Sequence, residues 1–356
     1  MILTALLFAL TFDQVLQQAS AAREANRLDE AIRLYRQAAR LKPAASEAWW
    51  YLGTLLYEKD DFRGAAPAFE KLTALEPRGG AGWALLGLCE FGIGAYDKSL
   101  VHLHRGRMLG IADNKELERV ARYHQAILSN RAGQFELAMA LLTEFARQGS
   151  EQPELIEATG IAALRLALLP ADLPEEKKDI VLLAGKAAYA GNARRMADAR
   201  RHTEALLAKY PEHANVHYLM AVLLLQEHDD RAFAEFDKEL AISPDHVPAR
   251  LQIAIEYLQR GQPDKALPRA AEAAKLAPDN FAARTVHGRA LLESGDFAGA
   301  AGELESAVKL APDSPEAHFA LANAYSRAGR KADAQREREL FQRLQKMREG
   351  GVGVQR

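Results

Sequence analysis

Apolar and polar positions follow a helical period along most of this chain, and residues 46–79 show it most clearly. The apolar positions in the first half of this stretch share the i, i+3, i+4 spacing of one helix face: Trp49, Leu52, Leu56 and Tyr57. A polar turn follows at Lys59–Asp61, and residues 65–74 predict a second helix, which Pro77 cannot continue. Because two helices this short cannot bury their apolar faces alone, the pair is expected to stack on neighbouring pairs.

The pattern recurs at a nearly constant interval. The prolines that follow the second helices are 34, 34, 34 and 33 residues apart over four intervals: Pro43–Pro77, Pro244–Pro278, Pro278–Pro312 and Pro211–Pro244. A small alanine and a bulky residue four positions later precede several of them, as at Ala65 and Phe69. The chain is therefore predicted to be an array of similar helix pairs.

The unit at 46–79 resembles the tetratricopeptide repeat (TPR). It fits that family's W-x2-L-G…A-x3-F…P pattern, with the family's tyrosine displaced to Tyr57, at the following residues: Trp49, Leu52, Gly53, Ala65, Phe69 and Pro77. The resemblance covers residues 12–348. It implies an all-α fold, a right-handed α-solenoid of about eight to nine helix-turn-helix repeats.

The period fails between Pro153 and Pro211, which are 58 residues apart. The pattern predicts an additional helix at residues 154–169. This helix ends at a loop that contains Pro170 and Pro174. Two stacks with an irregular junction are therefore expected. The predicted segments are an apolar N-terminal segment at 1–12, an N-terminal TPR stack at 13–152, the extra helix and Pro-containing loop at 153–179, a C-terminal TPR stack with a charged capping helix at 180–348, and a disordered tail at 349–356.

Residues 1–12, MILTALLFALTF, are apolar but too few to span a bilayer. Two interpretations stay open. The segment is similar to the apolar core of an export signal, which would send the chain to the periplasm or cell envelope. It equally fits an N-terminal helix that packs on the first repeat of a cytoplasmic protein. No Lys or Arg precedes the segment, and no clear cleavage site follows at once.

The charge balance argues against nucleic acid as the expected partner. The chain has 46 Lys and Arg residues against 48 Asp and Glu residues, for a net charge of −2. Nucleic-acid-binding proteins usually carry a basic face. Cys89 is the only cysteine, so an intrachain disulfide and a cysteine metal cluster are both excluded.

No sequence motif indicates catalysis. The chain lacks a G-x-S-x-G motif and a phosphate-binding loop, and Gly92–Gly94 falls where a turn between helices is expected. His213 and His217 have the i, i+4 spacing of a metal-chelating pair, but no glutamate completes an H-E-x-x-H motif. Packing or surface histidines are the better interpretation. We therefore expect no enzyme, no metal and no cofactor; a catalytic site at 153–179 is the alternative, and nothing catalytic is present in that stretch.

The resemblance also implies a ligand-binding groove. In TPR proteins, positions 2, 5, 9 and 12 of the repeat commonly face a ligand on the concave side. The residues that this implies here are mostly apolar or aromatic: Trp50, Thr54, Tyr57, Ala84, Leu88, Phe91, Tyr123, Ile127, His217, Ala221, Leu251, Ile255, Leu258, Thr285, Arg289, Leu292, Phe319 and Asn323. No repeat combines Lys at position 5 with Asn at position 9, so the carboxylate clamp of chaperone-binding TPR proteins is not supported. Packing between repeats is the alternative role for each residue.

An apolar groove favours a peptide, a helix or a hydrophobic segment as the ligand. The leading hypothesis is a non-enzymatic scaffold or adaptor that holds a protein or peptide partner by shape and apolar complementarity. The alternative is a self-associating structural component, a homo-oligomer whose groove is filled by its own or a neighbouring chain.

Overall fold

The computed structural model describes residues 10–111 and 114–352, and every regular element within them is helical. This confirms the all-α prediction of paired helices. The bounds of the helices are α1 Phe12–Glu24, α2 Leu28–Leu41, α3 Ser46–Glu58, α4 Phe62–Leu75, α5 Gly80–Gly92, α6 Tyr96–Leu109, α7 Lys115–Arg131, α8 Phe135–Arg147, α9 Pro153–Ala163, α10 Lys178–Asn192, α11 Met196–Lys209, α12 Val216–Gln226, α13 Arg231–Ile242, α14 Val247–Gln259, α15 Pro263–Leu276, α16 Phe281–Glu293, α17 Phe297–Leu310, α18 Pro315–Arg327 and α19 Lys331–Val352, with short 3-10 turns at Pro170–Asp172 and Glu175–Lys177.

The chain divides into two compact units. Unit 1 comprises residues 1–206 and unit 2 comprises residues 207–356, so the boundary falls within α11. The sequence prediction placed the junction earlier, at 153–179. In the structure α9 packs against α10, and this contact keeps the 153–179 region inside unit 1.

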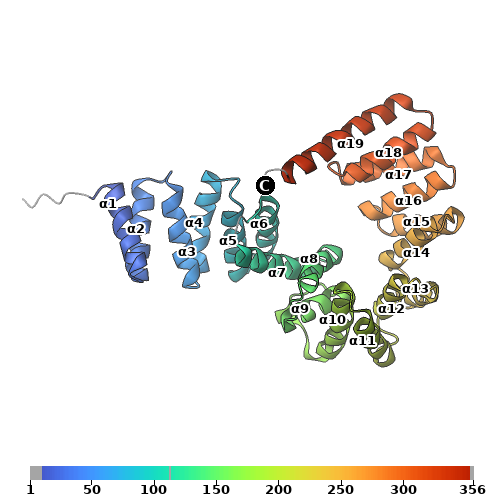
Figure 1. Cartoon of the computed structure of the whole chain (residues 1–356), viewed down its shortest axis with the longest axis horizontal. Coiled ribbons are helices and arrows are strands. Elements are labelled where there is room, and N and C mark those ends of the chain that lie inside the picture. Colours follow the sequence, from blue (N-terminus) through green and yellow to red (C-terminus); the bar gives the residue numbers. More distant parts are fainter. Residues whose placement is uncertain (1–9, 112–113, 353–356) are drawn as a thin grey trace, which may run out of the picture. The chain divides into compact units, whose positions relative to one another are not determined.

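Each helix of unit 1 from α1 to α10 packs on the next along the chain (Figure 1). One continuous apolar core runs through them, from Val15 in α1 to Tyr189 in α10. Unit 2 contains smaller clusters, one around α14–α16 and another around α17–α19. This nearest-neighbour packing is what an array of similar repeats requires.

The two helices of a repeat touch through a glycine and a bulky side chain. A Cβ atom placed on Gly53 would be 2.8 Å from the Phe69 ring, so only glycine allows this approach. Gly87 faces Leu103 and Gly288 faces Leu304 in the same way, each pair also 16 residues apart. These two repeat positions therefore require a glycine and a bulky apolar side chain that fills the space above it. Leucine meets this requirement as well as phenylalanine does.

A second contact joins each of several repeats to the one before it. The Trp49 Nε1–H donates a hydrogen bond to the Pro43 carbonyl oxygen at 2.8 Å. The same bond to a carbonyl six residues earlier recurs in three other repeats: Trp83 to Pro77, Arg284 to Pro278 and His318 to Pro312. The shared requirement at this repeat position is a side-chain N–H that can bond the carbonyl oxygen of the preceding proline. Arginine and histidine can replace tryptophan there because each provides such a donor.

The helix predicted at 154–169 is shorter than expected. It ends at Ala163, and Arg165 takes a left-handed backbone conformation with φ of 55°. Glycines then bring α9 and α10 into backbone contact. A Cβ atom on Gly160 would overlap the Val181 carbonyl oxygen, and one on Gly185 would overlap the Ile156 carbonyl oxygen. The helix predicted as an extra one is therefore packed closely against α10.

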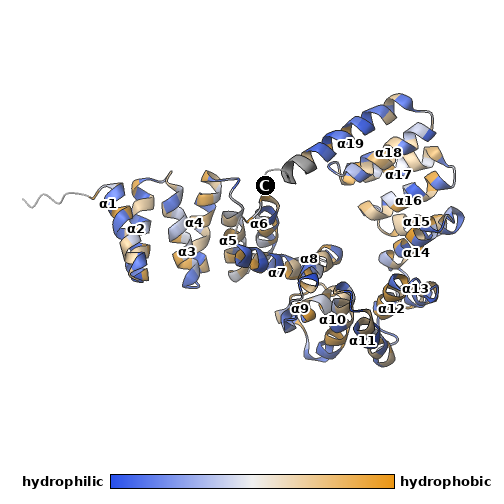
Figure 2. Ribbon diagram, in the orientation of Figure 1, coloured by the Kyte–Doolittle hydropathy of each residue, from blue (hydrophilic) through white to orange (hydrophobic). Residues whose placement is uncertain are grey.

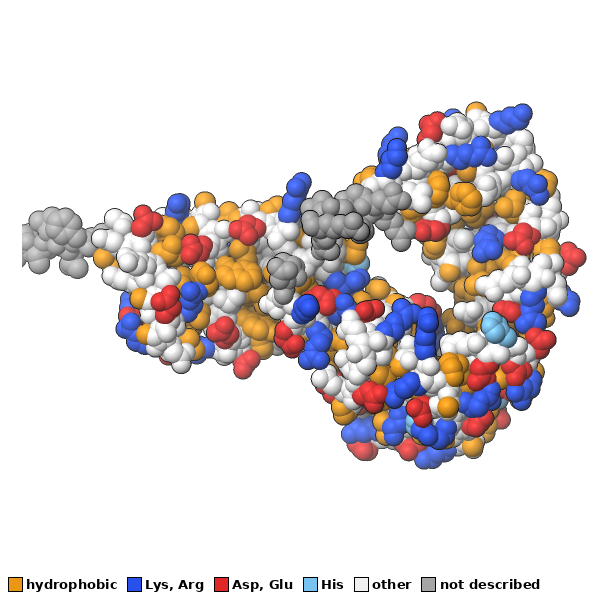
Figure 3. Space-filling view, viewed as in Figure 1, with side chains coloured by type: hydrophobic (Ala, Val, Ile, Leu, Met, Phe, Trp, Pro, Cys, Tyr) orange, Lys and Arg blue, Asp and Glu red, His pale blue; other side chains and the backbone are white. Residues whose placement is uncertain are grey.

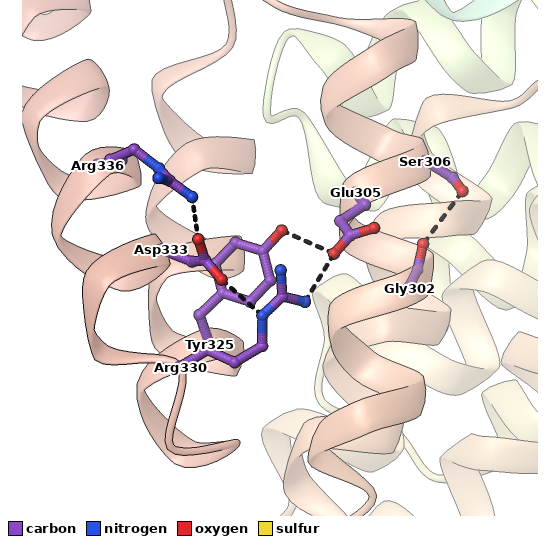
Figure 4. Close-up of polar contacts among 7 residues, drawn as sticks. All are labelled: Gly302, Glu305, Ser306, Tyr325, Arg330, Asp333 and Arg336. Atoms are coloured by element: carbon purple, nitrogen blue, oxygen red, sulfur yellow. Dashed lines mark hydrogen bonds and ion pairs between the residues drawn. The ribbon is translucent and has the colours of Figure 1, made fainter.

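The end of unit 2 is closed by a polar network between α17, α18 and α19 (Figure 4). Glu305 accepts hydrogen bonds from the Tyr325 hydroxyl at 2.7 Å and from Arg330 at 3.0 Å. The bond from Tyr325 holds the pKa of Glu305 below its ordinary value, while burial and this carboxylate raise the pKa of Tyr325 to about 12. Arg330 also binds Asp333 at 2.7 Å, so one guanidinium joins two helices.

Figure 2 shows that α19 is hydrophilic over most of its length, as expected for a capping helix.

Both chain ends differ in detail from the predicted segments. Residues 1–9 of the apolar stretch lie outside the described residues. Thr11 caps α1 through a reciprocal pair of bonds with Gln14, so the helix begins at Phe12. Residues 349–352 of the predicted tail continue α19, and 353–356 lie outside the described residues. Within the described ranges, no helix is both long enough and apolar enough to cross a membrane.

Cys89 is expected to resist thiol reagents in the folded chain. Its side chain is fully buried in α5, and burial raises the pKa of the thiol to about 12, with a further contribution from Glu90. Because only the thiolate reacts, labelling by Ellman's reagent at pH 8 should be roughly 1,000-fold slower than in the urea-unfolded chain. Complete labelling of the folded chain within minutes would contradict this burial.

Candidate groove and pocket in unit 1

The predicted groove residues fall into three classes of exposure. Leu88, Leu251 and Leu258 are buried in the cores, as are Ala84, Ile127, His217 and Ala221, so these side chains offer a ligand almost no surface. Most of the others are half-buried: Trp50, Thr54, Tyr57, Phe91, Tyr123, Ile255, Thr285, Leu292 and Asn323. Arg289 is exposed, and Phe319 is 51% exposed although it contacts Phe341.

The two histidines with the spacing of a metal pair, His213 and His217, differ in their local structure. His213 precedes α12, whereas His217 lies in its first turn and contacts Glu235 through Nδ1 at 2.5 Å. Nowhere in residues 10–111 and 114–352 do three or more His, Cys, Asp or Glu side chains gather as a metal site would need.

Aromatic rings gather where α5 meets α7, and this group is called the aromatic cluster: Phe91, Tyr96, Tyr123 and His124. The Phe91 ring meets the His124 ring edge to face at 4.7 Å and the Tyr96 ring at 5.5 Å. Tyr123 meets His124 at 5.5 Å. Figure 3 shows further hydrophobic side chains gathered over the α3–α5 region of unit 1. The cluster gives unit 1 a partly exposed aromatic surface beside its core.

A pocket of about 150 Å³ opens next to the aromatic cluster, between α7, α8 and the start of α9. Its aliphatic and aromatic lining comes from all three helices: Val120, Tyr123, His124, Phe145 and Leu155. Its polar lining is Arg119, Gln152 and Glu154. The buried Asn130 holds α9 against α7 by donating a hydrogen bond to the Ala158 carbonyl oxygen at 3.0 Å. The pocket walls are therefore set by helix packing rather than by a loop.

The environment of the pocket shifts two of its titratable groups. Burial raises the pKa of Tyr123 to about 12, and the nearby carboxylates of Glu154 and Glu157 add to this shift. Burial lowers the pKa of His124, although its Nδ1 bonds the Val120 carbonyl oxygen at 2.8 Å. Since a carbonyl only accepts, Nδ1 carries the proton. At neutral pH the pocket thus presents a neutral phenol and a neutral imidazole.

Of the pocket residues, only Tyr123 is among the predicted groove residues. A signal for others was present in the 34-residue register. Counted from Arg119, the next repeat begins at Pro153, where α9 starts, and its second and fifth positions are Glu154 and Glu157. This register was not recognised because the loop containing Pro170 and Pro174 interrupts the 34-residue period that follows. Phe145 and His124 had no such signal because their contacts depend on how three helices converge.

Models of the tetratricopeptide repeat match residues 16–62 and 52–103 in unit 1 and residues 291–337 in unit 2. The chain is a TPR protein. The family matches found are all of repeats, and none is of an enzymatic domain. No curated protein sequence matches the chain significantly.

Several solved structures are similar to parts of this TPR chain. MamA residues 41 to the end from Desulfovibrio magneticus RS-1 share 22% identity over 48% of this chain and 96% of that one, with a TM-score of 0.42. MamA from AMB-1 shares 25% identity over 45% and 96%, with a TM-score of 0.40. Yeast Tom70 shares 16% identity over 94% and 85%, with a TM-score of 0.37. At these TM-scores the similarities say nothing of what this chain binds.

Proposed function

We propose that this chain is a non-enzymatic interaction scaffold that holds a segment of a partner protein on unit 1. The bound segment is centred on the pocket between α7, α8 and α9. The observation that carries the proposal is the pocket itself: it opens on the surface beside the aromatic cluster, and its walls are rigid helices. A partly exposed aromatic surface next to a concave apolar site is the usual composition of a binding hot spot.

The chemistry of the pocket favours binding over catalysis. Its neutral phenol and imidazole have no serine, threonine, cysteine or lysine beside them among the pocket residues, and the thiol of Cys89 is fully buried in α5. Tyr123 and His124 offer ring faces and edges, which suit an apolar or aromatic side chain. Rigid helical walls reduce the entropy that is lost on binding, so a short segment can bind with useful affinity.

Tyr123→Ala should weaken the binding of peptides selected from a phage-displayed library on the purified full chain by about 10-fold or more. The mutation removes a ring that forms one wall of the pocket. Affinities would be measured by fluorescence anisotropy, with circular dichroism to verify folding. Tyr51→Ala is the matched control, because Tyr51 is also half-buried in unit 1 but contacts Tyr35 and Arg23 away from the pocket.

Equal loss of binding in both tyrosine variants would show that the effect comes from the fold and not from the pocket. A library that yields no binder, or binders that are insensitive to Tyr123→Ala, would refute the assignment of the groove to unit 1.

A further inference from the structure

Two carboxylates at one side of the pocket form no ion pair in the part of the chain that the structure describes. Glu154 and Glu157 are three residues apart on α9 and therefore project from the same face of that helix. Glu154 is exposed and lines the pocket, and Glu157 is half-buried beside it. Neither side chain has an ion-pair partner within the described ranges of the chain.

The basic side chains around the pocket are already engaged. Arg119 pairs with Glu116 at 3.3 Å, and Arg122 pairs with Glu118 at 2.5 Å and approaches Glu144 at 4.0 Å. Two further cations are paired: Arg195 with Glu151 and Lys178 with Glu175, each at 2.6 Å. The bond to Glu175 raises the pKa of Lys178, and the charge of Glu157 adds to this rise without an ion pair. After these pairs are formed, the α9 side of the pocket keeps an excess of negative charge.

The field of these carboxylates reaches the pocket wall. Glu154 lines the same pocket as Tyr123, and the charges of Glu154 and Glu157 both add to the rise in the pKa of Tyr123 that burial causes. The half-buried Tyr123 ring also presents a face that attracts cations, whereas the Phe145 ring is buried and already has the Arg122 guanidinium 5.6 Å from its centre. An acidic ligand would meet repulsion here, whereas a basic one would be attracted.

The volume of the pocket limits what can enter it. A dry apolar cavity of about 150 Å³ accommodates a benzene ring. The pocket has the same volume, so it has room for one large apolar side chain and not for a longer stretch of backbone. The charged groups of a ligand must therefore lie outside the apolar part, near the α9 face.

We propose that the segment held by unit 1 is basic and apolar: one large apolar side chain fills the pocket, and a neighbouring Lys or Arg pairs with Glu154 and Glu157. This inference rests on the proposed function, since it specifies the partner of the same site. Such a segment is opposite in charge to the acidic C-terminal peptides that a carboxylate clamp holds.

The test is a positional-scanning peptide library, screened against the purified full chain at low and high salt. Selected peptides should combine a large apolar residue with Lys or Arg one to four positions away. The double variant Glu154→Gln/Glu157→Gln should bind them about fivefold more weakly at low ionic strength, and the difference should shrink in high salt. The control Glu70→Gln/Glu76→Gln removes two exposed carboxylates from the α4 region and should bind like the wild type.

A matched peptide separates charge from shape. Replacing the Lys or Arg of the best peptide by citrulline or norleucine should weaken its binding to the wild type but not to the Glu154→Gln/Glu157→Gln variant. Peptides that depend on Tyr123 but show no preference for basic residues would overturn this inference and leave the proposed function intact. If no selected peptide depends on Tyr123, the proposed function fails, and this inference fails with it.

Discussion

Gly160→Ala should lower the free energy of unfolding of unit 1 by about 3 kcal/mol, because the added methyl group has no space. Gly160 is buried where α9 crosses α10, and a Cβ atom there would overlap the Val181 carbonyl oxygen. Backbone atoms cannot rotate away as a flexible side chain can. The two helices must therefore separate, which would also widen the pocket that α9 helps to form.

The measurement is urea unfolding followed by circular dichroism, with hydrogen exchange and mass spectrometry to locate the change. Exchange should accelerate in α9 and α10 first, since each repeat contacts mainly its neighbours. Gly191→Ala, on the packing partner α10, is the control, because the nearest atom to the added carbon there is the Ala199 side chain at 3.9 Å. That variant should be neutral or up to about 1 kcal/mol more stable. Equal stability of the Gly160 variant and the wild type would refute the backbone contact.

Phe69→Ala should cost about 3–5 kcal/mol, the range for removing a fully buried aromatic ring. The Phe69 side chain is completely buried and fills the space above Gly53 between α3 and α4. Phe69→Leu should cost much less, about 1 kcal/mol, because Leu103 and Leu304 fill the equivalent space above Gly87 and Gly288.

The two variants would be compared by urea unfolding, and hydrogen exchange would show whether the loss is confined to α3 and α4. A leucine variant as unstable as the alanine variant would mean that the repeats are not interchangeable at this position. Restoring stability by adding Gly53→Ala to Phe69→Ala would further support the pairing, because the two residues share one space.

Much of the fold could be predicted because its determinants are local in the sequence. The 34-residue interval between prolines, the small residue at Gly53 and the bulky residue at Phe69 all act within one helix pair. Such contacts involve residues that are close in sequence, and a repeat array multiplies them. The helix pairs of the observed structure follow this pattern from α1 to α8 and again from α12 to α19.

The irregular region was harder to predict because its contacts join distant residues. The Pro170 and Pro174 turns interrupt the period, and nothing local indicates that α9 will meet α10 through Gly160 and Gly185. The sequence prediction therefore treated α9 as an extra helix, and the boundary between compact units falls later in the chain, within α11.

The groove residues, too, could be predicted only in part from the sequence. The repeat register assigned the half-buried Tyr123 to the groove, but it also assigned Leu88, Leu251 and Leu258, which are buried. Position in a repeat determines which way a side chain points, whereas exposure depends on how closely the next helix approaches. That approach varies with the size of the neighbouring side chains.

The sequence by itself determined the helix pairs, their period and the residues that join the two helices of each repeat. These features follow from helical spacing, from glycine at close contacts and from prolines that end helices. Only the tertiary structure decided where the compact units divide, which groove residues stay accessible, and that α7, α8 and α9 enclose a pocket with unpaired carboxylates beside it. The physical reason is that a pocket is what remains between helices after they pack, so its walls depend on contacts between residues far apart in the chain.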